Sequence, residues 1–193
     1  PYTNSLKRVI EFFGKEDKGR FRFVTKYSDI DSLLNINHNN HTEIRFSINT
    51  PKIIDSYEHY TASSNKRIEA AAKAAKAGYK IGFIIAPVFL YENWKDDYKK
   101  LIKHIKDTLP ENYHETLTFE VISHRYTTKA KNRIIEIFPE TTLPMVDDHR
   151  TFKYGQFGYG KYVYTKEQLL DMKEFFKENI LNEFPKSEIK YII

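Results

Sequence analysis

The sequence predicts an α/β fold, formed as the later part of a partial (β/α) barrel with parallel strands. Segments with the aromatic, β-branched and alternating pattern of strands follow one another along the chain, and helix-like segments separate most of them. Strands that alternate with helices of this length form parallel sheets with the helices packed outside. The number of strands is short of a complete barrel, so we expect only a part of one.

Each expected strand is a short run rich in aromatic and β-branched residues. The alternation is clearest in the first, which reads RFRFVTK. A loop of His and Asn residues, 35–41, separates the first strand and the short helical stretch after it from the second strand. The expected strands are residues 20–26, 43–48, 79–85, 117–123 and 188–193.

The expected helices carry apolar residues three and four positions apart. The clearest is rich in alanine, follows the candidate caps Ser63, Ser64 and Asn65, and is closed by Gly78. A long irregular stretch, residues 139–160, interrupts the alternation of strands and helices. The expected helices are residues 6–13 with a stop at Gly14, 29–34, 66–77, 92–108, 128–137 and 166–181.

The chain contains no cysteine among its 193 residues. Iron–sulfur clusters are held by Cys thiolates, so this chain cannot hold one in the usual way. A hydrophobic share of 40%, with 14 Tyr and 14 Phe, excludes a disordered chain. A formal net charge of +5 favours a polyanionic partner, although a small positive excess also suits a soluble protein without one.

The start of the chain gives no signal for export or membrane insertion. The chain opens at Pro1 rather than Met, and no charged-then-apolar leader follows. Its apolar runs are all shorter than the roughly 18 residues of a membrane-spanning helix. We therefore expect a piece of a larger cytoplasmic protein with no membrane partner. The sequence carries no signal of oligomeric state.

Polar and small residues stand at the expected carboxyl ends of the strands. These ends carry Lys26, Ser47 with Asn49, Ala86 with Pro87, and His124 with Arg125. Each one alone is more readily explained as a solvated or hydrogen-bonded residue than as a functional one. In a parallel sheet, however, all of these ends meet at one edge, which is where ligands bind.

A segment at about residues 150–164 interleaves lysines, aromatic residues and glycines. Its cations suit phosphates and its flat rings suit unstacked bases. The glycine order G-x-x-G-x-G is not a dinucleotide fingerprint, because it does not join a strand to a helix. The segment is the best candidate for contact with DNA, and the alternative is a Tyr-rich hairpin that caps the core. Its candidate contacts are Lys153, Gln156, Phe157, Lys161 and Tyr162.

Five segments, in order and with matching spacing, resemble those of the spore photoproduct lyase family. They are IRFSIN at 44–49, KRIEAAAKAAKAGY at 66–79, GFIIAP at 82–87, HR at 124–125 and KYGQFGYGKY at 153–162. The resemblance covers essentially the whole chain. It implies that residues 1–193 form the C-terminal part of a partial barrel of the radical S-adenosylmethionine type. It also implies repair of the spore-specific thymine dimer in UV-damaged DNA.

The resemblance implies two cofactors, S-adenosylmethionine and a [4Fe–4S] cluster. In the family, three cysteines hold the cluster, the cofactor is cleaved to a 5′-deoxyadenosyl radical, and a further cysteine returns a hydrogen. All of these cysteines are expected upstream of Pro1, so we expect no catalytic residue in this chain and no activity from it alone. Lys26, Ser47 and Ala86 match positions that line the S-adenosylmethionine site. Lys26 is expected to pair with the cofactor's carboxylate or to hydrogen-bond its sugar.

The implied partner is double-stranded DNA that contains a thymine dimer, and the implied location is the spore core. Members of the family carry Lys-Trp-Gly-Arg-Tyr-Gly where residues 153–158 read KYGQFG. The lesion contacts at Gln156 and Phe157 therefore differ from the family pattern. Lys161 keeps its match, which makes it the expected phosphate contact.

Two other functions stay open from the sequence. A non-catalytic nucleic-acid-binding module would bind DNA without any dependence on S-adenosylmethionine. A metal-dependent barrel hydrolase acting on damaged DNA would need several His, Asp or Glu at strand ends, where His124 is nearly alone. We expect His38, His41 and residues 147–149 to be loop residues rather than metal ligands, and the basic stretch 127–133 to be a solvated face.

Overall fold

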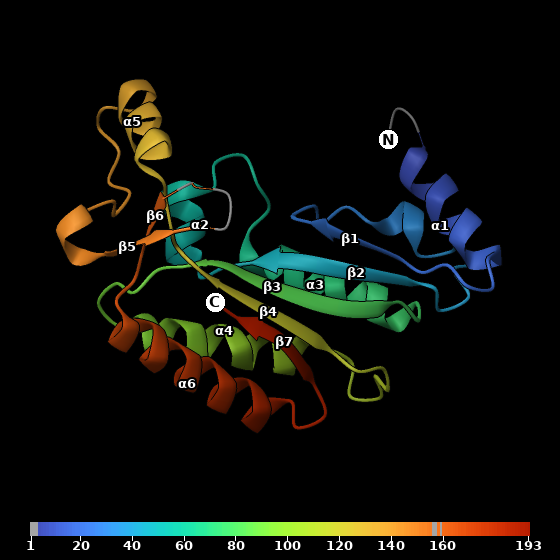
Figure 1. Cartoon of the computed structure of the whole chain (residues 1–193). Coiled ribbons are helices and arrows are strands. Elements are labelled where there is room, and N and C mark those ends of the chain that lie inside the picture. Colours follow the sequence, from blue (N-terminus) through green and yellow to red (C-terminus); the bar gives the residue numbers. More distant parts are fainter. Residues whose placement is uncertain (1–3, 156–157, 159) are drawn as a thin grey trace.

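The predicted parallel α/β fold is confirmed by a computed structural model that describes residues 4–155, 158 and 160–193. Its main sheet has five strands, and every neighbouring pair is parallel. The strand order, β1-β2-β3-β4-β7, follows the order of the chain (Figure 1). The strands are β1 (Phe21–Thr25), β2 (Thr42–Ile48), β3 (Lys80–Val88), β4 (Thr118–Ser123) and β7 (Glu188–Ile192).

Five of the six described helices form two groups by position, and α1 instead packs against β1 and β2. Helices α3, α4 and α6 cover one face of the sheet, whereas α2 and α5 lie beyond the edge at which the strands end (Figure 1). A small antiparallel hairpin of β5 (Thr151–Tyr154) and β6 (Gly160–Val163) lies at that same edge. The helices are α1 (Ser5–Lys15), α2 (Pro51–Tyr57), α3 (Ser64–Lys76), α4 (Trp94–Thr108), α5 (Thr128–Ile137) and α6 (Lys166–Glu183), with 3-10 turns at Asp31–Leu33 and Asp147–His149.

Helices α3 and α6 have side-chain caps at their N-termini. Ser63 is the N-cap of α3, and its side chain accepts a hydrogen bond from the backbone N–H of Lys66. Gly78 follows the helix with φ +85, a conformation that glycine adopts without strain. Thr165 and Gln168 form a reciprocal capping box at the start of α6. These residues mark where α3 begins and ends and where α6 begins.

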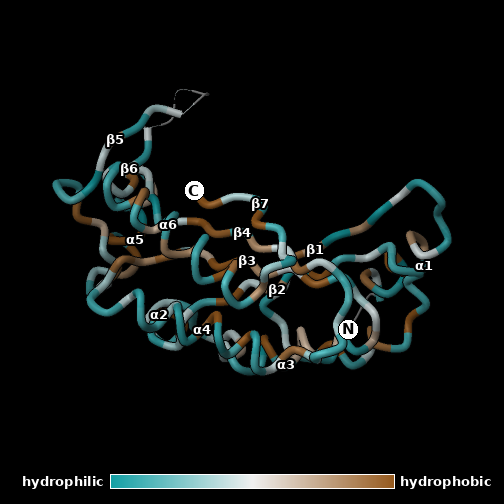
Figure 2. The backbone as a smooth tube through the Cα atoms, turned by 90° about the horizontal axis from the view of Figure 1, so that it is seen from below, coloured by the Kyte–Doolittle hydropathy of each residue, from teal (hydrophilic) through white to brown (hydrophobic). Residues whose placement is uncertain are grey.

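The hydrophobic core lies between the sheet and helices α3, α4 and α6. Apolar stretches run through the central strands, seen as brown segments in Figure 2, and their helix-facing side chains are buried. Burial of such residues removes apolar surface from water, which is the main favourable contribution to folding. The most fully buried members include Ile44, Phe46, Ile68, Ile81, Phe83, Tyr98, Phe119 and Phe176.

The opposite face of the sheet carries a polar network that extends from β2 to β7. Arg45 on β2 forms an ion pair with Glu120 on β4, and Tyr191 on β7 donates to the same carboxylate. Burial by itself raises the pKa of Glu120, but the hydrogen bonds from Tyr191 and Arg45 lower it overall. Arg45 on β2 must pass over β3 to reach Glu120 on β4. Gly82, its neighbour on β3, has no side chain and so leaves room for it.

Two expectations from the sequence are corrected here. Residues 139–160 are not wholly irregular, since they include a 3-10 turn at Asp147–His149 and the strand β5, which pairs with β6. Helix α2 was not expected, and it begins at Pro51, where the fixed φ of proline suits the first helical position. Among the described helices, none has the length and apolar character that crossing a membrane requires.

Candidate functional site

Lys26, Ser47 and Ala86 lie on neighbouring strands at the carboxyl edge of the sheet. Thr25 pairs with Phe46, so the residues that follow them, Lys26 and Ser47, are also neighbours. Ser47 pairs with Ile84, and Ala86 lies two positions further along β3 on the same face. The structure therefore brings all three expected cofactor-site residues to one edge.

A carboxylate from outside the sheet holds the Lys26 ammonium. Lys26 Nζ is 3.0 Å from Oε2 of Glu58, the residue that directly follows α2. The Glu58 side chain is only 7% exposed, whereas that of Lys26 is 41% exposed. The Lys26 ammonium can therefore contact a ligand while it stays paired with Glu58.

A fully buried arginine supports the same edge. Arg67, in the first turn of α3, is 0% exposed and donates through Nη2 to Glu58 Oε2 at 2.8 Å. Its Nη1 donates to the backbone oxygen of Ser47 at 3.0 Å, its Nε donates to Ala62 O, and its Nη2 also donates to Thr61 Oγ1. These bonds satisfy a charge that would otherwise be costly to bury.

Asn49 ties the end of β2 to the end of β3. Its Nδ2 donates to the backbone oxygen of Pro87 at 2.7 Å, and its Oδ1 accepts from Tyr98 Oη and from the backbone N–H of Thr50. Asn49 is completely buried, so these bonds replace the water it gave up. Asn49 is therefore a structural residue that fixes the position of Ala86 and Pro87 relative to Ser47.

His124 follows β4 and is also buried at this edge. Its ring stacks on Phe89 with centroids 4.4 Å apart, and its Nδ1 accepts from Arg150 Nη2 at 3.2 Å. Burial, together with the nearby Arg150 guanidinium, lowers the pKa of His124 from 6.5 to about 4. Arg150 is in turn held over the ring of Tyr164, at 3.6 Å from its centroid. The imidazole is therefore neutral at pH 7.

The lowered pKa of His124 predicts a loss of stability in acid. Between pH 6.5 and pH 4 the unfolded chain binds a proton at His124 and the folded chain does not, so the free energy of unfolding falls as the pH falls. We expect this residue to account for up to about 3 kcal/mol at pH 4. Urea unfolding at several pH values should show a shallower fall for His124→Gln. The exposed His114→Gln serves as control, and an unchanged slope for His124→Gln would contradict the assignment.

The hairpin places two lysines directly opposite each other. Lys153 on β5 pairs with Lys161 on β6, so their side chains share one face of the hairpin. Two cations at this spacing repel each other unless an anion lies near them. Gln156 and Phe157, two other expected contacts, lie outside the described residues. The lysine face and Tyr162 are therefore the parts of the candidate DNA interface that the structure describes.

The other face of the hairpin is aromatic. Phe152 and Tyr162 pack edge to face with centroids 5.0 Å apart, and Phe152 also packs edge to face against the exposed Tyr154. Tyr162 stacks on Tyr126, next to two backbone hydrogen bonds between the same residues. Tyr162 thus anchors the hairpin, which leaves Tyr154 as the more open ring. A Cβ at Gly160 would come within 2.0 Å of the Phe152 ring, so a larger residue there would displace that ring.

The comparisons with known proteins agree over the whole chain. The sequence profile named "Spore photoproduct lyase" matches residues 1–193. The chain belongs to the spore photoproduct lyase family. It is 57% identical over 192 residues to the spore photoproduct lyase of Clostridium acetobutylicum, and 42% identical over 189 residues to that of Bacillus subtilis. These alignments cover 100% and 98% of this chain but 56% and 55% of the relatives, so the chain spans about half of their length.

Solved structures of spore photoproduct lyases have the same fold. One is a variant with bound AdoMet and dinucleoside spore photoproduct, and it matches with a TM-score of 0.93 and 41% identity. Another, complexed with the dinucleoside spore photoproduct, gives the same values. Each covers 99% of this chain, and the chain covers 56% of each. The expected relation to a radical S-adenosylmethionine partial barrel is thereby confirmed for the fold.

The residues at the sheet edge suit AdoMet, which a solved structure of a spore photoproduct lyase contains. A half-exposed ammonium at Lys26, a hydroxyl at Ser47 and the small side chain of Ala86 suit the carboxylate, the polar groups and the close approach of S-adenosylmethionine. The iron–sulfur cluster does not fit this chain, because its sequence offers no thiolate.

The weaker motifs of the sequence have structural roles. His38 Nε2 donates to the backbone oxygen of Ala77 and its ring stacks on Tyr79, while His41 Nδ1 donates to Phe13 O. The two imidazole rings therefore hydrogen-bond different backbone oxygens. Within the described ranges, no three His, Cys, Asp or Glu side chains gather as they would around a metal ion. On the basic stretch, Lys131 pairs with Asp147 at 2.8 Å.

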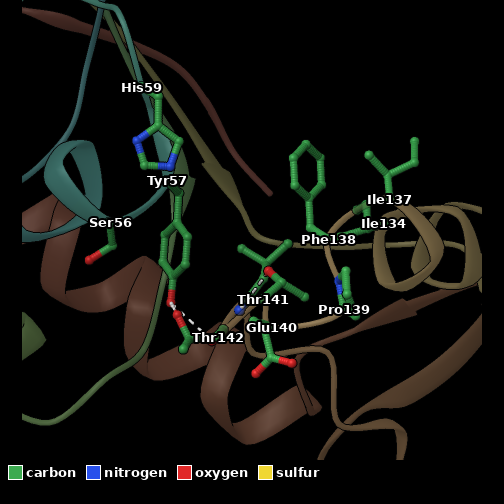
Figure 3. Close-up of a pocket in the computed structure, with 11 residues that line it drawn as sticks. Ser56, Tyr57, His59, Ile134, Ile137, Phe138, Pro139, Glu140, Thr141 and Thr142 are labelled. Atoms are coloured by element: carbon green, nitrogen blue, oxygen red, sulfur yellow. Dashed lines mark hydrogen bonds between the residues drawn. The ribbon is translucent and has the colours of Figure 1, made fainter.

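One cavity lies away from this edge. It has a volume of about 660 Å³ and separates the end of α2 from α5 and the loop after it. Figure 3 shows Ile134, Ile137 and Phe138 on one wall, facing Tyr57, whose Oη donates to Thr142 O. None of Lys26, Ser47 and Ala86 lines this cavity.

Sequence reasoning missed the residues that hold the site, namely Glu58, Arg67 and Arg150. A signal for Arg67 was present, because it lies one helical turn before the buried Ala70 and Ala71 and so falls on the buried face of α3. Glu58 and Arg150 follow no periodic pattern. Their partners at the sheet edge, Lys26 and His124, are distant in sequence and are brought to them only by the fold.

Proposed function

We propose that this chain is the C-terminal part of a protein that reverts the spore photoproduct in UV-damaged DNA to two thymines. The observation that carries the proposal is the meeting of Lys26, Ser47 and Ala86 at one sheet edge. A relative with 41% identity and a TM-score of 0.93 is described with bound AdoMet and dinucleoside spore photoproduct. We propose the spore as its place of action.

In this proposal, the chain contributes one wall of the cofactor site. Lys26 binds the carboxylate or the sugar of S-adenosylmethionine, Ser47 hydrogen-bonds it, and Ala86 allows its close approach. The cofactor supplies a carbon-centred radical when it is cleaved at a cluster held by another part of the protein. The neutral, buried His124 carries no charge near the edge at pH 7, so the cationic groups there are Lys26 and the arginines.

The hairpin contributes the contact with DNA. The lysine face of Lys153 and Lys161 neutralises phosphates, which relieves their mutual repulsion and releases counterions. The exposed Tyr154 offers a ring on which an extruded base can stack. A fused thymine pair must leave the base stack to reach an enzyme site, at a cost of a few kcal/mol that such contacts offset.

The test is an anaerobic assay of the protein with its upstream segment restored and its cluster reconstituted. We expect reversal of the spore-type thymine dimer together with cleavage of S-adenosylmethionine, both followed by mass spectrometry. The 193-residue chain alone should give neither, because it has no cysteine. Cleavage of the cofactor without reversal of the dimer would contradict the proposed substrate. The absence of both reactions in a cluster-loaded protein would favour a non-catalytic DNA-binding module.

Lys161→Ala is expected to weaken the binding of DNA to a similar extent for different sequences. Loss of one phosphate contact should reduce the slope of log K against log salt concentration by about 1. Fluorescence anisotropy with short duplexes at several salt concentrations measures both quantities. Lys99→Ala, an exposed lysine on α4, is the matched control. An unchanged affinity for Lys161→Ala would remove the lysine face from the DNA interface.

A further inference from the structure

One buried carboxylate joins two of the residues that we propose to contact the cofactor. Glu58 Oε2 lies 3.0 Å from Lys26 Nζ and 2.8 Å from Arg67 Nη2. Arg67 Nη1 then donates to the backbone oxygen of Ser47 at 3.0 Å. A continuous set of contacts therefore runs from the end of β1, through Glu58 and Arg67, to the end of β2.

The burial of this network differs from one end to the other. Arg67 is 0% exposed and the Glu58 side chain 7%, but the Lys26 side chain is 41% exposed. Glu58 Oε1 is buried and has no hydrogen-bond partner among the described residues, so the carboxylate depends on its two cations. Two cations and one carboxylate leave a charge of +1, and Lys26 is the member that solvent and ligands can reach.

This arrangement suits the binding of an anionic group at Lys26. A free lysine side chain has many rotamers, and ordering it on binding lowers affinity. The Glu58 contact orders it beforehand and uses one of the three N–H donors of the ammonium, which leaves the others for a ligand. Because Arg67 offsets the charge of Glu58, the carboxylate does not neutralise Lys26 completely.

We infer that Glu58 is a positioning residue for the cofactor: it holds the Lys26 ammonium at the sheet edge and, through Arg67, sets that ammonium relative to Ser47. The inference rests on the proposed function, because it assumes that Lys26 contacts S-adenosylmethionine. The inference adds one testable dependence to the proposed function. Glu58 acts only through Lys26, so its contribution to affinity must vanish when the Lys26 ammonium is absent.

A double-mutant cycle tests this dependence in the full-length protein with its cluster reconstituted and kept oxidised. The affinity for S-adenosylmethionine is measured by equilibrium dialysis for the parent, Lys26→Ala, Glu58→Gln and the double variant. We expect Glu58→Gln to weaken binding about tenfold in the parent and less than about twofold in the Lys26→Ala protein. Asp55→Asn removes an exposed carboxylate from the same helix and should leave the affinity unchanged.

The outcomes separate the inference from the proposed function. Equal losses for Glu58→Gln in both backgrounds would mean a general structural role and would overturn the positioning role. An unchanged affinity for Lys26→Ala would instead refute the cofactor contact itself. If Glu58→Gln does not fold, Glu58→Asp gives the same cycle, because it keeps the charge that Arg67 needs while it shortens the reach to Lys26.

Discussion

Replacing Arg67 by methionine is expected to lower the free energy of unfolding by about 3–5 kcal/mol. The guanidinium is fully buried and donates to Ser47 O, Glu58 Oε2 and Ala62 O, among others. Methionine fills much of the same volume but donates none of these bonds. It leaves Glu58 buried with Lys26 as its remaining cation, and a buried group without its partner is costly.

Urea unfolding followed by circular dichroism measures this loss. The control is Lys66→Met, which changes the preceding residue of the same helix at an exposed position and should shift stability by no more than about 0.5 kcal/mol. A loss below about 1 kcal/mol for Arg67→Met would show that the buried network contributes little to stability. In that case, the affinities measured in the double-mutant cycle of Lys26 and Glu58 would need no correction for partial unfolding of the variants.

The second large effect is expected at Gly82, on the polar face of the sheet. A Cβ at this position would come within 2.4 Å of Thr118 Oγ1, 2.9 Å of Arg45 Cγ and 3.0 Å of Glu43 Oε1. Gly82→Ala must therefore displace Arg45, which reaches across β3 to Glu120. We expect a loss of about 2–3 kcal/mol, at the upper end of what overpacking costs.

A second substitution distinguishes this crowding from a general weakness of the strand. Thr118→Ala removes the nearest atom, so the Gly82→Ala and Thr118→Ala double variant should recover part of the lost stability. The measurement is again urea unfolding of all four proteins. If the two losses simply add, the crowding between β2, β3 and β4 is not the cause.

The sequence was sufficient for the regular elements because their signals are local. The α3 helix could be predicted from its alanine run, its Ser63 cap and its closing Gly78, and β2 from its alternation. Lys26, Ser47 and Ala86 could be placed at one edge because parallel strands end together. Their assignment to a cofactor came from the resemblance to the family and not from their chemistry alone.

The remaining features depend on contacts that are distant in sequence or on segments too short for a pattern. All four residues of β5 are exposed, so this strand has no alternation to detect. Helix α2 has only seven residues and begins with Pro51. A proline in a sequence can equally indicate the end of a helix or strand. Glu58 looks like a surface residue until the fold brings Arg67 and Lys26 to it.

The strand order of the sheet also bears on how the chain folds during synthesis. Because β1, β2, β3 and β4 pair in the order in which they leave the ribosome, each can join a neighbour that is already present. The last pairing is different, since β7 must return to β4 across α5, the hairpin and α6, from Ser123 to Glu188. This is the longest of the four loop closures, and its entropic cost makes β7 the strand that docks last.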